Sequence, residues 1–246
     1  MHWDEEYLLR LEVDTVHGLV AGAGEAPPTV RDKKVDAVFA WSPRARVLAL
    51  GHGVQDPGPV PGPEQEYAPD VMPRVLVRLS ETLGGGTDTI EGGPCFVFPQ
   101  QLTAGTAAPL RVIVSDAAGR EAAGRLLRPD NWEPDEWGEL TRGEMGEWAM
   151  AVHDDSPVSI CFSPARNALA AEAGIWTRAD FRGRRIAPAV VTAWSQRERR
   201  HKKVLFYSTT AANRASQSVA RTLGLVPLGW IWTVLRTSHQ EAASGP

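Results

Sequence analysis

The hexapeptide Arg-Gly-Arg-Arg-Ile-Ala at residues 182–187 constrains this chain more than any other feature. It follows an apolar run at residues 173–177, and the apolar residues after it recur on one helical face. Pro188 suits the first turn of a helix, where the N–H that proline lacks would have no partner within the helix. The hexapeptide is therefore predicted to be a turn that joins a strand to a helix.

This turn has three properties that suit a phosphate group. Gly183 permits a tight backbone path close to a ligand. A helix that begins near Ala187 would expose unpaired N–H groups and the positive end of its dipole. Arg182, Arg184 and Arg185 add charge-assisted hydrogen-bond donors. The turn is interpreted either as a pyrophosphate site or as a solvated basic loop.

The second half of the chain alternates between strand and helix patterns. Strands are predicted at residues 110–115, 148–152, 158–162, 204–208 and 228–235. Helices are predicted at residues 121–127 and 135–142, and from a cap at Asn213 to Gly224. The stretch at 153–157 has turn composition, and the turn is the preferred role for His153 over contact with a substrate.

The first half carries no recognisable chemical motif. Strands are predicted at 35–41 and 47–50, and a helix is predicted after Pro73 that stops at the glycines 84–86. Residues 1–105 are interpreted as an accessory region for packing or as a lid, with a second active site as the alternative. Residues 106–240 form the second predicted domain and 241–246 a flexible tail.

Composition excludes several classes of protein. The net charge of −4 argues against bulk nucleic-acid binding. Cys95 and Cys161 lie in apolar runs and are expected to be buried thiols. The six histidines show no metal-ligand spacing, so no metal is expected. The acidic start lacks the pattern of a signal peptide and no membrane span is visible, so a cytoplasmic location is expected.

The order of turn, helix, strand and Asn-capped helix resembles the GNAT superfamily of acyl-CoA-dependent N-acyltransferases. In that family the turn reads Arg/Gln-x-x-Gly-x-Gly/Ala. Arg182 takes the first place, Ala187 takes the last, and Arg185 stands where the family usually has glycine. The resemblance covers about residues 110–236.

Two further positions carry the resemblance. Asn213 and Ser216 match an Asn-x-x-Ser/Ala pattern, and Leu-Gly-Leu follows at 223–225. The implied fold is α/β (α+β): a mixed, mostly antiparallel central sheet flanked by helices, with an additional N-terminal α/β region. The strand before the turn is expected to splay from its neighbour.

The resemblance also implies roles for individual residues. Backbone N–H groups from Ile175 to Thr177 would bind the thioester carbonyl and the pantetheine arm, and those of the turn would hold the pyrophosphate. The predicted cofactor-binding residues are Ile175, Trp176, Thr177, Arg182, Gly183, Arg184, Arg185, Ile186, Ala187, Asn213 and Ser216. The alternative role of Asn213 is that of a plain helix cap.

Acetyl transfer needs a base for the amine and an acid for the leaving thiolate. Glu172 is the candidate general base, and an exposed carboxylate at the start of a strand is the alternative. Many family members place a tyrosine where this chain has Ala220. Ser216 is therefore the candidate acid, with Tyr207 or water as substitutes.

The predicted function is transfer of an acetyl group from acetyl-CoA to a primary amine by direct attack in a ternary complex. The acceptor would be a small molecule or a protein, and a homodimer is possible. One alternative is a catalytically weakened relative that serves as an acyl-CoA-binding or scaffold protein. Another is a nucleic-acid-binding domain that uses the arginines between 178 and 203. The basic run at 197–203 is either a contact for the 3′-phosphate of CoA or a solvated helix end.

Overall fold

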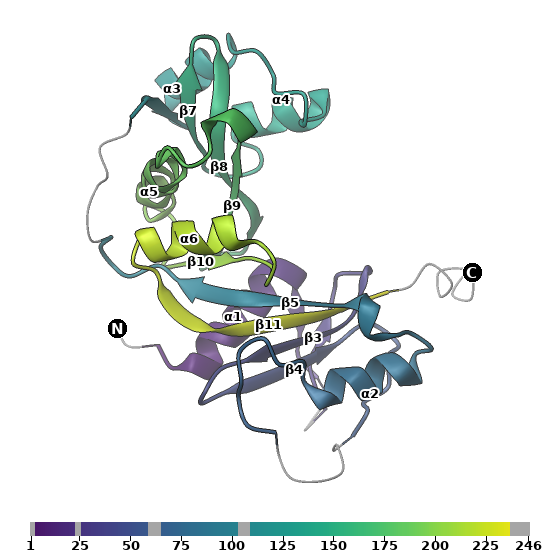
Figure 1. The fold of residues 1–246 in the computed structure, drawn as a ribbon. Helices are drawn as coiled ribbons and strands as arrows, with labels where there is room; N and C mark the ends of the chain where they lie inside the picture. Colours follow the sequence, from purple (N-terminus) through teal and green to yellow (C-terminus); the bar gives the residue numbers. More distant parts are fainter. Residues whose placement is uncertain (1–2, 23–25, 59–64, 103–108, 237–246) are drawn as a thin grey trace. The chain divides into compact units, whose positions relative to one another are not determined.

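The computed structural model describes residues 3–22, 26–58, 65–102 and 109–236 (Figure 1). The chain divides into two compact units by its internal contacts. Unit 1 comprises Met1–Cys95, Ser208–Asn213 and Pro227–Pro246, and unit 2 comprises Phe96–Tyr207 and Arg214–Val226. The division expected between residues 105 and 106 and the tail at 241–246 lie outside the described residues.

Unit 1 contains strands in the order β1-β2-β4-β3-β11-β5 and two α-helices among its described residues. The strands are β1 (Leu19–Val20), β2 (Thr29–Val30), β3 (Val35–Trp41), β4 (Arg46–Leu50), β5 (Ile90–Val97) and β11 (Val226–Leu235). The helices are α1 (Glu5–His17), α2 (Arg74–Thr82) and the 3-10 turn η1 (Thr87–Thr89).

Strand β3 is the centre of unit 1. It pairs antiparallel with β4 on one edge and β11 on the other, and all of its residues are buried. Helix α1 contacts β3 and β4, and α2 places Leu76 and Leu79 in a core with Phe39 and Trp41. A strand that is buried along its whole length requires such cover on both faces.

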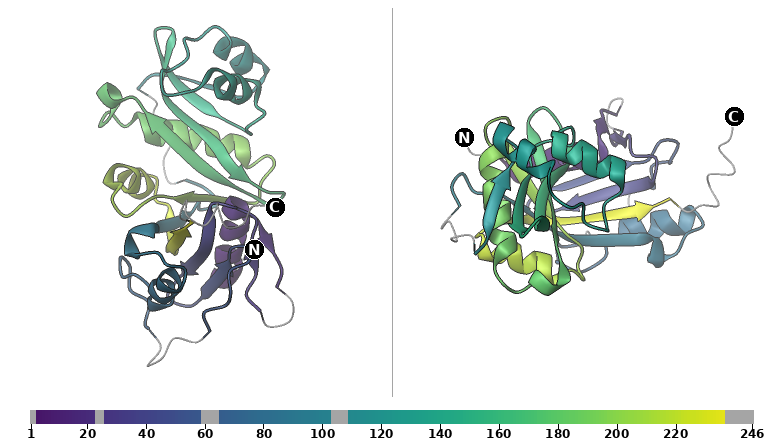
Figure 2. Two further views of the ribbon diagram at one scale, coloured as in Figure 1. Left: turned by 90° about the vertical axis from the view of Figure 1, so that its right-hand side faces the viewer. Right: turned by 90° about the horizontal axis from the view of Figure 1, so that it is seen from above.

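Unit 2 is built on strands in the order β10-β9-β8-β7-β6. The strands are β6 (Arg111–Val114), β7 (Ala149–His153), β8 (Ser156–Arg166), β9 (Ala170–Thr177) and β10 (Val204–Ser208). The helices are α3 (Ala117–Ala123), α4 (Pro134–Arg142), the 3-10 turn η2 (Ala179–Phe181), α5 (Ile186–Glu198) and α6 (Arg214–Thr222). Figure 2 gives two further views of these elements.

Two hydrophobic cores lie on opposite faces of the unit 2 sheet because successive strand residues point to opposite sides. On β7, Ala149 and Ala151 pack with residues of α5 and α6, whereas Met150 packs with residues of α3 and α4. The strands pair antiparallel except for β9 and β10, which are parallel. The expected fold class, a mixed and mostly antiparallel sheet flanked by helices, is confirmed.

Element boundaries differ from the sequence predictions where caps or tertiary packing decide them. The helix predicted at 121–127 is α3, and it begins earlier because the Asp116 carboxylate accepts a hydrogen bond from Gly119 N at 2.8 Å. Helix α1 and strand β5 were not predicted. None of the described helices combines the length and the apolar character needed to cross a membrane.

Candidate active site

The strand before the turn separates from its parallel neighbour. The register between β9 and β10 runs from Val204 opposite Ala170 to Phe206 opposite Glu172. Strand β9 continues to Thr177 and keeps its pairing with β8 on the other edge. Within the described chain, the residues of β9 after Glu172 therefore pair with β8 and not with β10. The backbone groups of these residues that do not face β8 lie on the open edge of β9. This is the arrangement expected for two strands that splay apart.

A bulge in β8 lies beside this opening. The register shifts between Phe162, opposite Gly174, and Ala165, opposite Glu172. Such a shift bends a strand and increases its local twist. A Cβ atom at Gly174 would lie 3.0 Å from both Phe162 and Pro164, so the missing side chain allows this close approach.

The predicted turn lies directly between β9 and α5. Gly183 has a φ of 72° and Arg185 a φ of 59°, both in the left-handed region. Arg185 thus adopts the backbone conformation that a glycine would adopt without strain. Glycine at this position could adopt the same backbone angles.

The ring of Phe181 supports the arginines of the turn. It is buried against the core of unit 2, and the guanidinium carbons of Arg178 and Arg184 lie 4.5 Å and 5.0 Å from its centroid. Arg178 also pairs with Asp180 at 2.8 Å, and this hydrogen bond lowers the pKa of the Asp180 carboxyl. Arg182 Nε donates to the Thr177 carbonyl at 3.1 Å.

The start of α5 fits an anionic group. Its N-cap residue, Arg185, makes no side-chain capping hydrogen bond, so the first N–H groups of this 13-residue helix point outward without a side-chain cap. A Cβ atom at Gly183 would meet nothing within 4 Å in the described structure. Arg182, Arg184 and Arg185 are exposed around this open space. The residues predicted to hold a pyrophosphate are thus brought together.

Glu172 lies at the mouth of the opening. It is the last residue of β9 in register with β10, and its side chain is 6% exposed. Its neighbours Ala171 and Ala173 belong to the core beneath α5 and α6, so alternation places Glu172 on the opposite face of the sheet. The prediction of an exposed strand-entry carboxylate is wrong, and a role as base remains a prediction.

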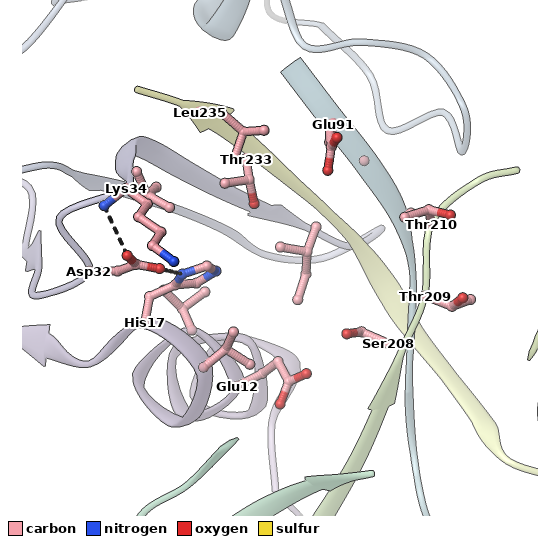
Figure 3. Close-up of a pocket in the computed structure, with 16 residues that line it drawn as sticks. Glu12, His17, Asp32, Lys34, Glu91, Ser208, Thr209, Thr210, Thr233 and Leu235 are labelled. Carbon is pink, nitrogen blue, oxygen red and sulfur yellow. Dashed lines mark hydrogen bonds and ion pairs between the residues drawn. The ribbon is translucent and has the colours of Figure 1, made fainter. Parts of the chain in front are cut away.

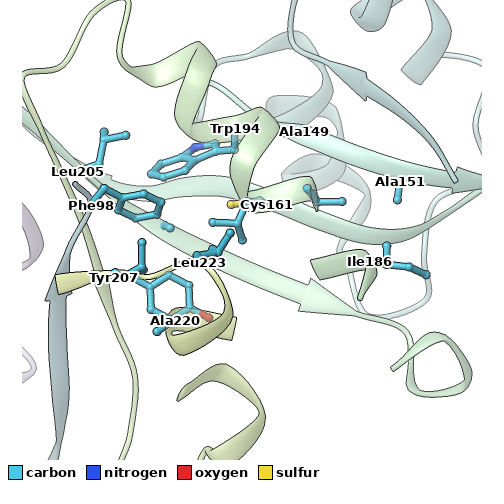
Figure 4. Packing of buried hydrophobic residues seen from close by; sticks show 14 of the residues in the cluster. Phe98, Ala149, Ala151, Cys161, Ile186, Trp194, Leu205, Tyr207, Ala220 and Leu223 are labelled. Carbon is cyan, nitrogen blue, oxygen red and sulfur yellow. The ribbon is translucent and has the colours of Figure 1, made fainter. Parts of the chain in front are cut away.

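Ser216 is joined to Tyr207. The two hydroxyl oxygens lie 2.6 Å apart, and both residues are buried. Tyr207 and Ala220 belong to the same core, and Figure 4 shows the phenol ring beside Ala220. Burial raises the pKa of Tyr207 to about 12, although the hydrogen bond to Ser216 opposes this.

Other predicted contacts are placed elsewhere. Asn213 directly precedes α6 and is exposed, and its role as a cofactor contact or as a helix cap stays a prediction. The basic run lies at the far end of α5, about 20 Å from the turn for a helix of 13 residues. There Arg197 pairs with Glu147 at 3.1 Å, and Arg199 donates to the Phe98 carbonyl at 3.4 Å. Arg197 and Arg199 thus have structural partners, whereas Arg200 and Lys203 are exposed, as expected for a solvated helix end. A contact with the 3′-phosphate of CoA stays a prediction.

Several other residues have structural roles. Trp132 and Trp148 are buried in the core beside α3 and α4, and both cysteines are buried free thiols. His153 belongs to the β7–β8 hairpin, and its ring lies 5.1 Å from that of Phe181. Among the residues with defined placement, no group of three or more potential ligands could hold a metal ion.

Sequence reasoning missed Phe181 as part of the site. The signal was present in the spacing of Arg178, Phe181 and Arg184, which brings two cations to one ring in a tight turn. Sequence reasoning also did not identify the hydrogen-bond partner of Ser216. Tyr207 and Ser216 come from different elements, and only the fold brings them together.

Comparison with solved structures identifies proteins of similar fold. A GCN5-related N-acetyltransferase-like protein from Streptococcus suis is 16% identical, with a TM-score of 0.46 over 67% of this chain and 69% of that one. An acetyltransferase of the GNAT family from Colwellia psychrerythraea is 15% identical, with a TM-score of 0.44 over 60% and 56%. A tandem GNAT protein from the clavulanic acid biosynthesis pathway is 14% identical, with a TM-score of 0.48 over 81% and 62%.

The family assignment rests on the sequence. No curated protein matches the chain. Residues 107–226 match the family model described as an acetyltransferase (GNAT) domain. This match includes the opening between β9 and β10, the turn at 182–187 and the Tyr207–Ser216 pair. Residues 107–226 are therefore identified as a GNAT acetyltransferase domain.

Proposed function

We propose that this protein transfers an acetyl group from acetyl-CoA to a primary amine by direct attack in a ternary complex. The single observation that carries the proposal is the continuous path from the open edge of β9 to the start of α5. Along this path lie first the residues of β9 that do not pair with β10, and then the arginines and the N-terminus of α5. That order suits an elongated ligand with a thioester at one end and a pyrophosphate further along.

The turn residues supply binding. The N–H groups at the start of α5 and the exposed guanidinium groups of Arg182 and Arg184 are the proposed donors to phosphate oxygens. Ile175 and Trp176 send their side chains into opposite cores, which fixes the backbone between them. Arg178 N donates to the Val158 carbonyl of β8, so alternation along β9 directs the N–H groups of Ile175 and Thr177 to the open edge. These two N–H groups are the proposed donors to the thioester carbonyl.

Acetyl-CoA supplies a thioester whose carbonyl carbon accepts the amine nitrogen while the C–S bond breaks. Glu172, at the mouth of the opening, is the proposed base that removes a proton from the attacking amine, directly or through water. Its carboxylate takes one proton for each amide bond that is formed.

Ser216 is the proposed donor of a proton to the departing sulfur. A serine hydroxyl is a weak acid, but Tyr207 can replace the donated proton through their 2.6 Å hydrogen bond. The ring of Tyr207 lies beside Ala220 of α6 in the same buried core (Figure 4). In this proposal Tyr207 acts on the sulfur through Ser216 and is a positioning residue.

Calorimetric titration with acetyl-CoA tests the binding step. We expect binding by the natural sequence and a loss of at least about tenfold in affinity for Arg182→Glu and Arg184→Glu. Arg200→Glu makes the same charge change at an exposed position beyond the other end of α5 and serves as the control. Absence of binding by the natural sequence would refute the proposal.

Release of free thiol in the presence of a panel of amines tests the chemistry. Turnover supports the transferase, whereas binding without thiol release across the panel would indicate an acyl-CoA-binding relative. Glu172→Gln should lower kcat at neutral pH and leave the KM for acetyl-CoA unchanged. Glu139→Gln, at an exposed position on α4, is the matched control.

The acceptor, the assembly and the location stay predictions. The acceptor is a small-molecule or protein amine, and the cytoplasm is the expected compartment. Trp230 and Trp232 are buried in the core of unit 1, so these side chains are not part of an exposed face on which a homodimer would form.

A further inference from the structure

His153 lies at the end of β7, and its ring contacts the same aromatic side chain as two arginines near the turn at 182–187. The centroid of the Phe181 ring lies 5.1 Å from that of the imidazole, and the two rings are inclined by 60°. The guanidinium carbons of Arg178 and Arg184 lie 4.5 Å and 5.0 Å from the same centroid. One buried ring is therefore surrounded by two arginines and one histidine.

His153 is also placed to pair with the residue that follows it. Its Nδ1 lies 3.2 Å from Oδ2 of Asp154, on the hairpin between β7 and β8. Asp154 has a φ of 53°, in the left-handed region that aspartate and asparagine adopt more readily than most residues with a side chain. The two side chains together carry one negative charge when the imidazole is neutral and no net charge when it is protonated.

The imidazole is near enough to the arginines to affect an anion that they bind. Because the centroid of Phe181 lies 5.1 Å from the imidazole centre and 5.0 Å from the guanidinium carbon of Arg184, these two groups are at most about 10 Å apart. The Debye length in 0.1 M salt is about 10 Å, so charges at this separation still interact.

The charges around Phe181 already act on one another. The hydrogen bond from Arg178 lowers the pKa of the Asp180 carboxyl, and the positive charge of Arg184 lowers it further. A change of charge on the neighbouring hairpin is expected to act over the same range.

Among the described residues of this cluster, His153 is the one histidine. Histidine is the side chain that ordinarily changes its charge between about pH 5 and 8, whereas carboxylates and guanidinium groups keep theirs. The carboxylates nearby are those of Asp154, Asp155 and Asp180. The guanidinium groups nearby are those of Arg178 and Arg184 beside Phe181, and of Arg111 on β6 and Arg128 after α3, whose segments hydrogen-bond to β7 or to the hairpin.

We propose that His153 regulates the binding of the CoA pyrophosphate, which becomes tighter when the imidazole is protonated. This inference rests on the proposed function, because CoA is the ligand of the turn. With a neutral imidazole, the carboxylate of Asp154 repels the pyrophosphate. A protonated imidazole offsets that repulsion. His153 acts through the charge beside Phe181 and needs no contact with the ligand.

Calorimetric titration with dephospho-CoA at pH 5.5 and pH 8.5 tests this dependence. Dephospho-CoA keeps the pyrophosphate of CoA but lacks the 3′-phosphate, so the charge on the phosphates of the ligand is the same at both pH values. In about 0.01 M salt, we expect the natural sequence to bind about two- to fivefold more tightly at pH 5.5 than at pH 8.5. In about 1 M salt, where the Debye length is about 3 Å, this difference should disappear.

Variants of the hairpin assign the effect to charge. His153→Gln should bind equally at both pH values, with the affinity that the natural sequence has at pH 8.5. His153→Lys keeps a positive charge at both pH values and should bind at pH 8.5 as tightly as the natural sequence does at pH 5.5. Asp154→Asn removes the negative charge, suits the left-handed backbone and should tighten binding at pH 8.5 by about twofold.

Two other histidines that pair with carboxylates serve as matched controls. His17 Nδ1 lies 3.2 Å from Asp32 Oδ2 in unit 1, beside a pocket of about 370 Å³ (Figure 3). His201 Nε2 lies 3.4 Å from Glu147 Oε1, beyond the far end of α5. His17→Gln and His201→Gln should keep the pH dependence of the natural sequence.

Equal affinity of the natural sequence for dephospho-CoA at both pH values would overturn the inference, as would an unchanged pH dependence in His153→Gln. Loss of the pH dependence in either control variant, or no binding of dephospho-CoA, would also overturn it. The titration with acetyl-CoA described above distinguishes these results from failure of the proposed function. If acetyl-CoA binds, the proposed function stands whatever dephospho-CoA does, and if neither compound binds, both proposals fail.

Discussion

The hydroxyl of Tyr207 lies 2.6 Å from Oγ of Ser216 in a hydrogen bond buried inside unit 2. Burial raises the pKa of this phenol to about 12. The folded protein therefore holds the phenolic proton between pH 10 and pH 12, where the unfolded chain releases it. The stabilisation of the folded protein that results from this difference in pKa is complete below pH 10 and is lost as the pH rises toward 12.

Removal of the phenol tests this dependence. From pH 8 to pH 11, the free energy of unfolding of the natural sequence should fall by about 1.4 kcal/mol more than that of Tyr207→Phe. Urea unfolding at both pH values measures the difference, in which the contributions of all other titrating groups cancel. Equal slopes for the two proteins would show that the phenol of Tyr207 ionises normally in the fold.

Arg185→Gly should increase stability and decrease affinity. The left-handed backbone at this position costs an L-residue about 1–2 kcal/mol, and the greater flexibility of glycine when unfolded offsets part of the gain. We expect the free energy of unfolding to rise by about 0.5–1 kcal/mol while acetyl-CoA binds less tightly.

Arg185→Ala separates these two effects. It removes the same charge and retains the backbone strain, so it should lose affinity without a gain in stability. Denaturant unfolding and calorimetry on the three proteins provide the comparison. A gain in stability in Arg185→Ala equal to that in Arg185→Gly would contradict the role of the backbone angle.

Gly183→Ala should lower the stability of the protein, whereas Arg185→Gly should raise it. A methyl group at this position meets no neighbouring atom, so the φ of 72° is the only source of strain. We expect a loss of about 1–2 kcal/mol in the free energy of unfolding. Gly124→Ala is the matched control, since Gly124 has a helical φ of −63° and should tolerate alanine without loss. Thermal unfolding of both variants measures the effect.

Phe181→Leu should weaken acetyl-CoA binding through the arginines. Leucine fills most of the buried volume but offers no ring to the guanidinium groups of Arg178 and Arg184. We expect an increase of about two- to fivefold in the Kd for acetyl-CoA. Phe39→Leu removes a buried ring from the core of unit 1 and should leave this Kd unchanged. Equal effects in both variants would point to general loosening of the fold.

Local patterns in the sequence identified elements of both units. The strands at 35–41 and 204–208 have the predicted bounds, because a continuous apolar run between polar breaks leaves few alternatives. The turn at 182–187 was recognisable from glycine, arginine and proline at fixed spacing. These features depend on neighbours in the sequence, and the sequence therefore determines them by itself.

Only the tertiary structure decided how distant residues meet. It brings Tyr207 to Ser216 and leaves Ala220 beneath the phenol, and it moves the last strand into unit 1. It also assembles Glu12, Asp32 and Glu91 around one pocket from three separate elements. Side-chain contacts between elements depend on strand order and packing, and the periodicity of a single segment carries no information about either.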